Sequence, residues 1–357
     1  VQCRLGGCPG TSGVVCVCSP RTGIRKALYL KRSHNNLYKL RLLWNRTKAG
    51  IGSNFCETRN SAPWWGKIMP KVRKPTHSGT WYTSDEQVLE CQLTSWLLGV
   101  DQVEAAPRAI IGPHAGYRYS GKCAAYAYRH IDKKQVRRIF LLGPSHHVYT
   151  PKCCLSGCTT YRTPLGDISV DQAVNEELSS TGEFEKMGLE VEEDEHSLEM
   201  HLPYIQKVMG DIQYTLVPIM VGSLTAINEK KYGKILAPYL EEPENFFIIS
   251  SDFCHWGRRF NYTFYDRKHG QIHQSIEHLD REGMRIIEQG DPGKFAAYLA
   301  TYENTICGRH PIAVLLHSLQ QSMQTFKITF TRYEQSSKCM CMSDSSVSYA
   351  SAVVVLD

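Results

Sequence analysis

Short apolar runs alternate with longer amphipathic stretches from residue 104 to the C-terminus, and this alternation restricts the possible folds more than any other feature of the sequence. It predicts an α/β domain in which helices flank both faces of a mainly parallel central sheet. The expected strands span residues 108–111, 136–142, 214–221 and 246–250, and two later strands, 327–333 and 347–356, are expected to pair antiparallel at a sheet edge. The expected helices span residues 123–130, 171–179, 197–209, 229–241, 271–289, 292–301 and 311–323.

Three of the expected strands run directly into loops that are rich in His, Asp, Cys or Gly. The first loop contains His114, the second contains His146, and the third contains Asp252 and His255. In open α/β sheets, ligands bind outside the carboxyl ends of the strands. We therefore expect these side chains to meet in one cleft, with Asp252 orienting an imidazole or acting as a base and His255 beside it.

Two further segments are candidates for the same cleft. One is residues 193–202, with His196 and His201, and the other contains Cys307. Helical spacing places His201 well round the helix from His196, so these two imidazoles are not expected to bind one ion together. Cys307 precedes an expected helix and is followed by cationic residues, which predicts a lowered thiol pKa.

A mixed set of imidazole and thiol groups suits iron, copper or zinc. Magnesium and calcium would require oxygen ligands instead. A single histidine more often has a structural role, but three strand-end loops with the same chemistry indicate a real site. The close set Cys153, Cys154 and Cys158 is a weak zinc signal without a matching partner set, so buried or surface thiols are the favoured interpretation.

The charge of the chain is unevenly distributed, which affects the expected partners. The whole sequence carries +6, but residues 1–68 hold twelve Lys and Arg against one acid, Glu57, and so carry +11. The remainder carries −5 and offers no basis for nucleic-acid binding. Residues 1–68 have neither the apolar core of a secretory signal nor the amphipathic Arg/Ser-rich helix of a mitochondrial presequence. The basic stretch 21–43, with its scattered leucines, keeps a targeting or nucleic-acid-binding arm as the alternative interpretation. We expect this basic leader to be disordered or upstream sequence, with the native chain starting at Met69 and one domain spanning 69–357.

Apolar runs and cysteine spacing predict where in the cell the protein is located. No stretch of 18 apolar residues occurs, so membrane insertion is not expected. The cysteines are not regularly spaced, and the chain has no secretory signal pattern. Both observations favour reduced thiols in a cytoplasmic protein.

Several motifs of the body, in their order and spacing, resemble those of the Memo family. They are THSGTWY (76–82), PHAGYRYSG (113–121), LLGPSHHV (141–148), DEHSLEMHLPY (194–204), SSDFCHWG (250–257), SIEHLD (275–280), ICGRHPI (306–312) and DSSVSYA (344–350). The resemblance covers essentially the whole body and supports a start at Met69, because Memo proteins begin shortly before the first of these motifs.

The resemblance implies a fold similar to that of class III extradiol dioxygenases, with a non-haem iron or copper site in the corresponding cleft. His114, His146 and Cys307 would be the metal ligands, and Asp252 and His255 would line the pocket. True dioxygenases of that class use a glutamate where this chain has Cys307. Because a thiolate oxidises readily and favours copper, ring cleavage of catechols is not expected.

The family also implies a role in relaying signals from receptor tyrosine kinases to the cytoskeleton during cell migration, through phosphotyrosine-bearing receptor tails or adaptors. Metal-dependent redox chemistry is the leading functional hypothesis. A second hypothesis is a metal-independent adaptor whose pocket binds phosphotyrosine peptides. A third is a cysteine hydrolase with Cys307 as nucleophile and His255 and Asp252 as base and orienting group.

Overall fold

The computed structural model describes residues 14–18, 25–29, 41–43, 71–101 and 107–356. The chain divides into two compact units, Val1–Lys67 and Ile68–Asp357, which are described separately. In the first unit, β1 (Val14–Cys18), β2 (Arg25–Tyr29) and β3 (Arg41–Leu43) form a small antiparallel sheet. The rest of that unit lies outside the described residues, and the expectation that the native chain starts at Met69 stays a prediction.

Four parallel strands form the centre of the larger unit, as the apolar runs predict. They lie in the order β11 (Thr215–Val221), β6 (Arg138–Pro144), β12 (Asn245–Ser250) and β5 (Pro107–Gly112). Successive side chains point to opposite faces of a strand. Ile110 and Ile248 accordingly belong to one hydrophobic core, and Ile111 and Ile249 belong to the other. Because both faces of this parallel sheet are buried, helices must cover each face.

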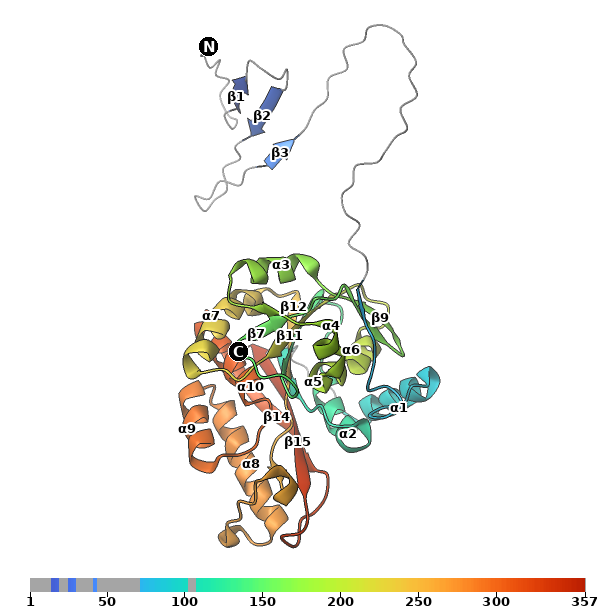
Figure 1. Ribbon diagram of the computed structural model, residues 1–357, viewed down its shortest axis with the longest axis vertical. Helices are drawn as coiled ribbons and strands as arrows, with labels where there is room; N and C mark the ends of the chain where they lie inside the picture. The colour runs from blue at the N-terminus through green and yellow to red at the C-terminus, as the bar shows by residue number, and fades with distance from the viewer. Residues whose placement is uncertain (1–13, 19–24, 30–40, 44–70, 102–106, 357) are drawn as a thin grey trace. The chain divides into compact units, whose positions relative to one another are not determined.

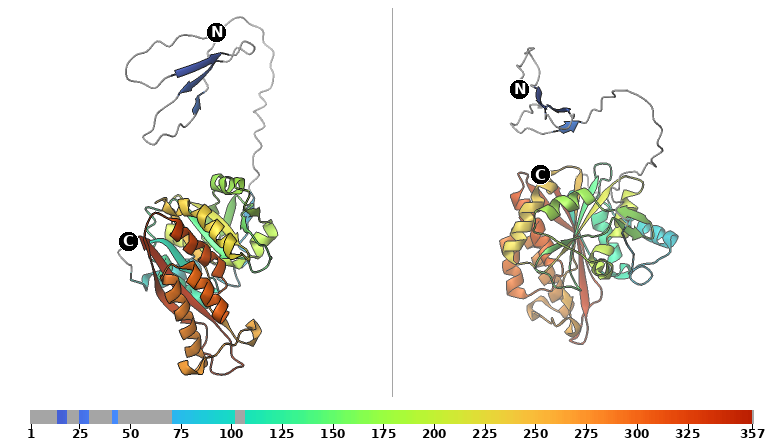
Figure 2. Two further views of the ribbon diagram at one scale, coloured as in Figure 1. Left: turned by 90° about the vertical axis from the view of Figure 1, so that its left-hand side faces the viewer. Right: turned by 45° about the horizontal axis from the view of Figure 1, so that its top comes forward.

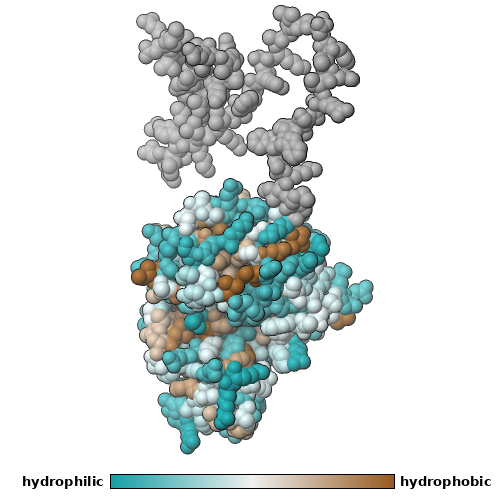
Figure 3. Space-filling model, viewed as in Figure 1, coloured by the Kyte–Doolittle hydropathy of each residue, from teal (hydrophilic) through white to brown (hydrophobic). Residues whose placement is uncertain are grey.

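Helices cover the two faces in two groups, which lie on opposite sides of the sheet in Figures 1 and 2. One group is α3 (Gln172–Ser180), α7 (Ala226–Glu241), α8 (Ile272–Glu288), α9 (Pro292–Tyr302) and α10 (Arg309–Gln321). The other is α1 (Glu86–Leu98), α2 (Tyr117–Tyr128), α4 (Leu189–Asp194), α5 (His196–Glu199) and α6 (Leu202–Met209). The face of the body seen in Figure 3 is mainly hydrophilic, with separate small hydrophobic groups.

Short and antiparallel strands extend the sheet at both sides. Beyond β11 lie β7 (Cys153–Leu155) and β10 (Glu185–Lys186). On the other side, β15 (Ser346–Leu356) pairs with β5, with β14 (Phe326–Gln335) and with the two-residue β13 (His255–Trp256). A separate small sheet contains β4 (Val72–Arg73), β8 (Thr160–Thr163) and β9 (Gly166–Ser169).

The last two strands pair antiparallel at one side of the sheet, as expected, with β15 between β5 and β14. One detail corrects the expected arrangement. The single helix expected over 197–209 is two helices, α5 and α6, with Met200 and His201 between them. Pro203, in the first turn of α6, cannot donate a backbone hydrogen bond and therefore favours a new helix start. Within the described residues, none of the helices combines the length and the apolar character needed to span a bilayer.

Candidate metal centre

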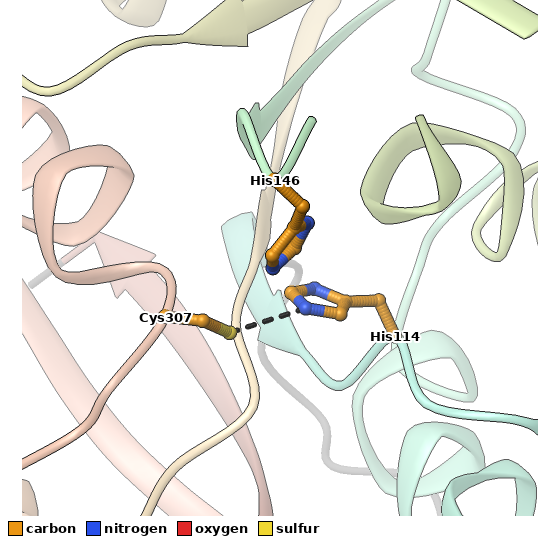
Figure 4. A group of neighbouring side chains, drawn as sticks. All are labelled: His114, His146 and Cys307. Atoms are coloured by element: carbon orange, nitrogen blue, oxygen red, sulfur yellow. Dashed lines mark hydrogen bonds between the residues drawn. The ribbon is translucent and has the colours of Figure 1, made fainter. Parts of the chain in front are cut away.

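The cleft forms where the carboxyl ends of three central strands meet. His114 follows β5, His146 follows β6 and Asp252 follows β12, each two residues beyond the strand. Cys307 reaches the same place from the loop between α9 and α10. Figure 4 shows the two imidazole rings and the thiol turned toward one another. One donor atom from each of His114, His146 and Cys307 lies within 4.8 Å of the other two.

A hydrogen-bond relay fixes the tautomer of His114. The hydroxyl of Ser250 donates to the carbonyl oxygen of Ser197 over 2.7 Å, so its oxygen is free to accept. The Nδ1–H of His114 donates to this oxygen over 2.6 Å. The proton of the neutral ring is therefore on Nδ1, and the Nε2 lone pair faces the cleft. Burial, reinforced by the neighbouring imidazoles of His146 and His196, holds the pKa of His114 well below its usual range.

A buried carboxylate orients His146 in a similar way. Glu195 accepts hydrogen bonds from the Nδ1–H of His146 over 2.9 Å and from its backbone N–H over 2.6 Å. The backbone N–H of Ser197 also donates to Glu195, over 2.8 Å. Burial opposes ionisation of Glu195, but the hydrogen bonds from His146 and the nearby imidazoles outweigh it and lower its pKa to about 2. The ring of His146 thus keeps its Nδ1 proton and presents Nε2.

Cys307 is positioned by a close contact between its loop and the end of β12. The backbone N–H of Gly308 donates to Ser251 Oγ over 3.1 Å. A Cβ atom on Gly308 would lie 2.3 Å from the Cβ of Ser251, so glycine is required for this approach. The Sγ atom of Cys307 then lies 3.1 Å from Nε2 of His114, and it accepts from the backbone N–H of Asp252 over 3.2 Å.

The expectation of a lowered thiol pKa at Cys307 is wrong. Burial, together with the carboxylate of Asp252, raises the pKa of Cys307 well above its usual value. The expectation relied on cationic residues next to Cys307 in the sequence, but these do not interact with its thiol. Arg309 is exposed, and His310 pairs with Glu229 over 2.6 Å. A metal ion bound in the cleft would favour the thiolate form of Cys307.

Asp252 and His255 both lie at the cleft, in different roles. A carboxylate oxygen of Asp252 accepts from the backbone N–H of His114 over 2.9 Å, and burial raises its pKa to about 7. The Nδ1–H of His255 is directed at two backbone carbonyl oxygens, those of Phe253 at 2.9 Å and Thr305 at 3.1 Å. Asp252 thus contacts a ligand candidate directly, whereas His255 is outside the group of donor atoms within 4.8 Å.

A family model described as "Memo-like protein" matches residues 73–353 of the chain. The chain belongs to the Memo family. Protein MEMO1 of Rattus norvegicus and that of Homo sapiens are each 50% identical to it over 289 residues, which cover 80% of this chain and 97% of the relative. The Protein memo-1 homolog of Caenorhabditis elegans is 46% identical over 288 residues, covering 79% of this chain and 82% of that protein. The crystal structure of uncharacterized protein JW3007 from Escherichia coli K12 aligns with 68% of this chain and 98% of its own, at a TM-score of 0.34 and 15% identity.

Glu195 and Ser250, which fix the tautomers of the two imidazoles in this Memo-family chain, were not predicted from the sequence. A signal for Glu195 was present, since metal-binding histidines usually donate to a carboxylate and an acid stands directly before the candidate His196. His196 itself stacks on His146 with ring centroids 4.3 Å apart, and its ring also lies 4.6 Å from that of Trp81. One donor atom from each of His146, Glu195 and His196 also lies within 4.8 Å of the others.

His201 has different surroundings from His196, as expected, although the spacing argument assumed one helix and the chain has a break between α5 and α6. Its Nδ1 is 2.6 Å from the hydroxyl of Tyr128, deep in the core of the second helix group. Burial lowers the pKa of His201 to about 3, so the ring is neutral. It therefore packs as a structural histidine beneath the cleft.

The weak zinc signal at Cys153, Cys154 and Cys158 has a structural explanation. All three thiols are buried. Cys153 and Cys154 are neighbours on β7 and therefore point to opposite faces, Cys153 into one hydrophobic core and Cys154 with Cys158 into the other. Thiols on opposite sides of a sheet cannot hold one ion, so the interpretation as buried thiols is confirmed.

The donor set in the cleft fits a soft or intermediate transition metal. It offers two imidazole nitrogens and one sulfur, which suit copper, iron or zinc more than magnesium or calcium. Ser250 and Glu195 occupy the Nδ1 positions, so both Nε2 atoms remain for an ion. Three protein donors leave coordination positions open, as in catalytic rather than structural metal sites.

Proposed function

We propose that this Memo-family protein holds an iron or copper ion between His114, His146 and Cys307 and that it acts in the cytoplasm, in receptor tyrosine kinase signalling to the cytoskeleton during cell migration. The convergence of the three donor atoms within 4.8 Å carries the metal part of the proposal. The cellular part rests on membership of the Memo family.

The residues around the donors would control protons and water at the ion. A bound iron or copper ion would supply one-electron redox chemistry and a Lewis acid in the cleft. Asp252, with its pKa raised to about 7 by burial, can hold or release a proton beside His114 at neutral pH. The Nδ1 of His255 is held by backbone carbonyl oxygens, so its Nε2 can accept a proton or bind a substrate group.

A groove next to the cleft supports the second candidate function, recognition of phosphotyrosine-bearing receptor tails or adaptors. Its volume is about 630 Å³, and Gly116 from the loop after His114 lines it. The exposed guanidinium groups of Arg118 and Arg259 and the indole of Trp81 also line it. Guanidinium groups bind phosphate through paired hydrogen bonds, and an aromatic wall suits a tyrosine ring.

Metal analysis of the purified full chain, without an affinity histidine tag, tests the leading proposal. We expect about one equivalent of iron or copper in the native protein, and its loss in His114→Ala and in Cys307→Ala. Cys91→Ala is the matched control, since Cys91 is an exposed thiol on α1. A metal-free protein that still binds phosphotyrosine peptides would replace the metal proposal with the adaptor function.

The hydrolase alternative is disfavoured by the environment of Cys307. Burial raises the pKa of its thiol, so little nucleophilic thiolate is present at neutral pH. Covalent trapping of Cys307 by an activated ester, lost in His255→Ala, would support the hydrolase instead. Oxygen uptake with catechols is expected to stay at background.

A further inference from the structure

Four sulfur-containing residues follow one another in the connection between β14 and β15, far along the sequence from the ligand candidates on β5 and β6. They are Cys339, Met340, Cys341 and Met342, called here the sulfur turn. Three of the four are exposed: the side chain of Met340 is 56% exposed, that of Met342 is 41% exposed, and the thiol of Cys341 is free and exposed. Apolar thioethers at the surface lose the burial that normally stabilises methionine, so packing does not explain this part of the turn.

Cys339 has a different role, because it anchors the turn. Its side chain is fully buried in the hydrophobic core that contains α8 and α9, and burial raises its thiol pKa to about 11. Its carbonyl oxygen accepts from the backbone N–H of His273 at the start of α8, over 3.1 Å. The anchor fixes the first residue of the turn and leaves the next three facing solvent.

Asp344 holds the exposed part of the sulfur turn in one conformation. One carboxylate oxygen of Asp344 accepts from the backbone N–H of Met340 over 2.8 Å and from that of Cys341 over 3.0 Å. The backbone N–H of Asp344 donates in turn to the carbonyl oxygen of Cys341 over 3.1 Å, which closes a β-turn over 341–344. These bonds present one thiol and two thioethers on adjacent residues of a fixed backbone.

Hydrogen bonds also connect the chain segments on the two sides of the sulfur turn, next to the end of β14 and the start of β15. The hydroxyl of Ser346 donates to the carbonyl oxygen of Ser337 over 2.8 Å, and the hydroxyl of Ser337 donates to the carbonyl oxygen of Ser345 over 2.7 Å. The sulfur turn therefore extends from a rigid hairpin, so that an ion bound there would meet donors that are partly pre-arranged.

We propose that the sulfur turn is a surface binding site for Cu(I), with the thiolate of Cys341 and the thioethers of Met340 and Met342 as ligands. Thiolate and thioether sulfur are soft ligands that select Cu(I). Zinc would require nitrogen, oxygen or further thiolate donors, and calcium and magnesium bind oxygen. On binding, the thiol of Cys341 loses its proton to solvent, a Cu–S bond forms, and the ion stays in the Cu(I) state.

This site is independent of the function proposed above, since it shares no ligand with the cleft. The turn joins β15, whose first residues pair with β13, the strand that carries His255. Occupancy of the two sites can nevertheless be separated by substitution, because His114 and Cys307 lie on other elements.

Anaerobic titration of the reduced full chain with Cu(I), in competition with a chromophoric Cu(I) chelator, tests the proposal. We expect Cys341→Ser to remove one equivalent of Cu(I) that the His114→Ala variant retains. The double variant Met340→Leu, Met342→Leu should weaken the same equivalent at least about tenfold, because even loss of outer-shell partners lowers metal affinity on that order. Matched controls are Cys91→Ser, an exposed thiol on α1, and Met323→Leu, a methionine that is 93% exposed; both should bind as the native chain does.

A second measurement reports the ligands directly. Silver(I), a redox-inert substitute for Cu(I), should shift the NMR signals of the Met340 and Met342 methyl groups and leave that of Met323 unchanged. Equal Cu(I) binding by the native chain and Cys341→Ser would overturn the proposal. So would loss of binding in Cys341→Ser without any effect of the double methionine variant, because the site would then be a single surface thiol.

Discussion

Glu195 accepts two hydrogen bonds from His146, one from its backbone N–H over 2.6 Å and one from its Nδ1–H over 2.9 Å. The carboxylate is fully buried, while the imidazole is 26% exposed. The loop after β6 is thus fixed to the segment before α5 at both the main chain and the ring. Such carboxylate–imidazole pairs orient metal ligands and raise their basicity.

Replacing Glu195 with glutamine should weaken metal binding without removing a ligand. The amide has one acceptor oxygen for three N–H donors, and its NH₂ group opposes one of them. We expect a 10–100-fold loss of metal affinity, on the order seen for such outer-shell changes. Chelator competition measures the affinity, and Asp194→Asn, at the exposed neighbouring position, is the control. Unchanged affinity in Glu195→Gln would show that His146 is not a ligand.

Gly308→Ala should displace Cys307 from His114. The new Cβ atom would lie 2.3 Å from the Cβ of Ser251 and 2.4 Å from the carbonyl oxygen of Ser250, so the backbone must move. We expect a loss of about 1–3 kcal/mol in the free energy of unfolding, typical of overpacking, together with weaker metal binding.

Denaturant unfolding and chelator competition on the same preparation separate the two effects of Gly308→Ala. Gly188→Ala is the matched control, because φ is −74° there and no atom lies within 4 Å of the added Cβ. That variant should stay within about 0.5 kcal/mol of the native protein. If Gly308→Ala binds metal normally, the close approach does not position the thiol.

The sequence predicted the place of the site because of a general property of parallel strands. Apolar runs that end in His114, His146 and Asp252 bring these residues to one edge whatever the details of the helices. The partners of the imidazoles were not predictable in the same way. Glu195 lies in a segment between short helices, and no periodicity shows which strand end that segment packs against.

Edge strands were the least predictable part of the fold. Strands such as β10 and β13 have two residues each, too few to produce an alternating pattern. The position of β15 depends on its pairing with β5, more than 200 residues earlier in the chain, which the composition of β15 does not encode. The break between α5 and α6 did have a local signal in Pro203, but the apolar spacing across it resembles one continuous helix.

Arg73→Met should destabilise the fold strongly. Arg73 and Glu199 form an ion pair of 2.7 Å with both side chains fully buried, and His77 and Tyr82 also donate to Glu199. Removing the guanidinium leaves a buried carboxylate without its main countercharge, which costs about 3–5 kcal/mol. Chemical denaturation measures this loss.

An exposed ion pair provides the control for Arg73→Met. Arg162 and Asp167 lie 3.0 Å apart with side chains 53% and 45% exposed. Arg162→Met should change the free energy of unfolding by no more than about 1 kcal/mol. Similar losses in the two variants would mean that burial of the Arg73 pair does not govern its contribution.

Asp280 should make the fold less stable as the pH rises from about 4 to about 6. It is buried on α8 and accepts from the backbone N–H of Cys254, from Asn304 and from the hydroxyl of Tyr333. Burial, partly offset by these hydrogen bonds, raises its pKa to about 6, whereas an aspartate in the unfolded chain titrates near 3.9. Between these values the folded state retains a proton that the unfolded state has lost, so stability falls with increasing pH and is level above the folded pKa.

Asp280→Asn should remove this part of the pH dependence, measured as the difference from the native protein in unfolding free energy at pH 4 and pH 7. The exposed Asp211→Asn should leave the dependence as it is, and a native-like profile in Asp280→Asn would show that this carboxyl is ionised in the fold at pH 4 to 6.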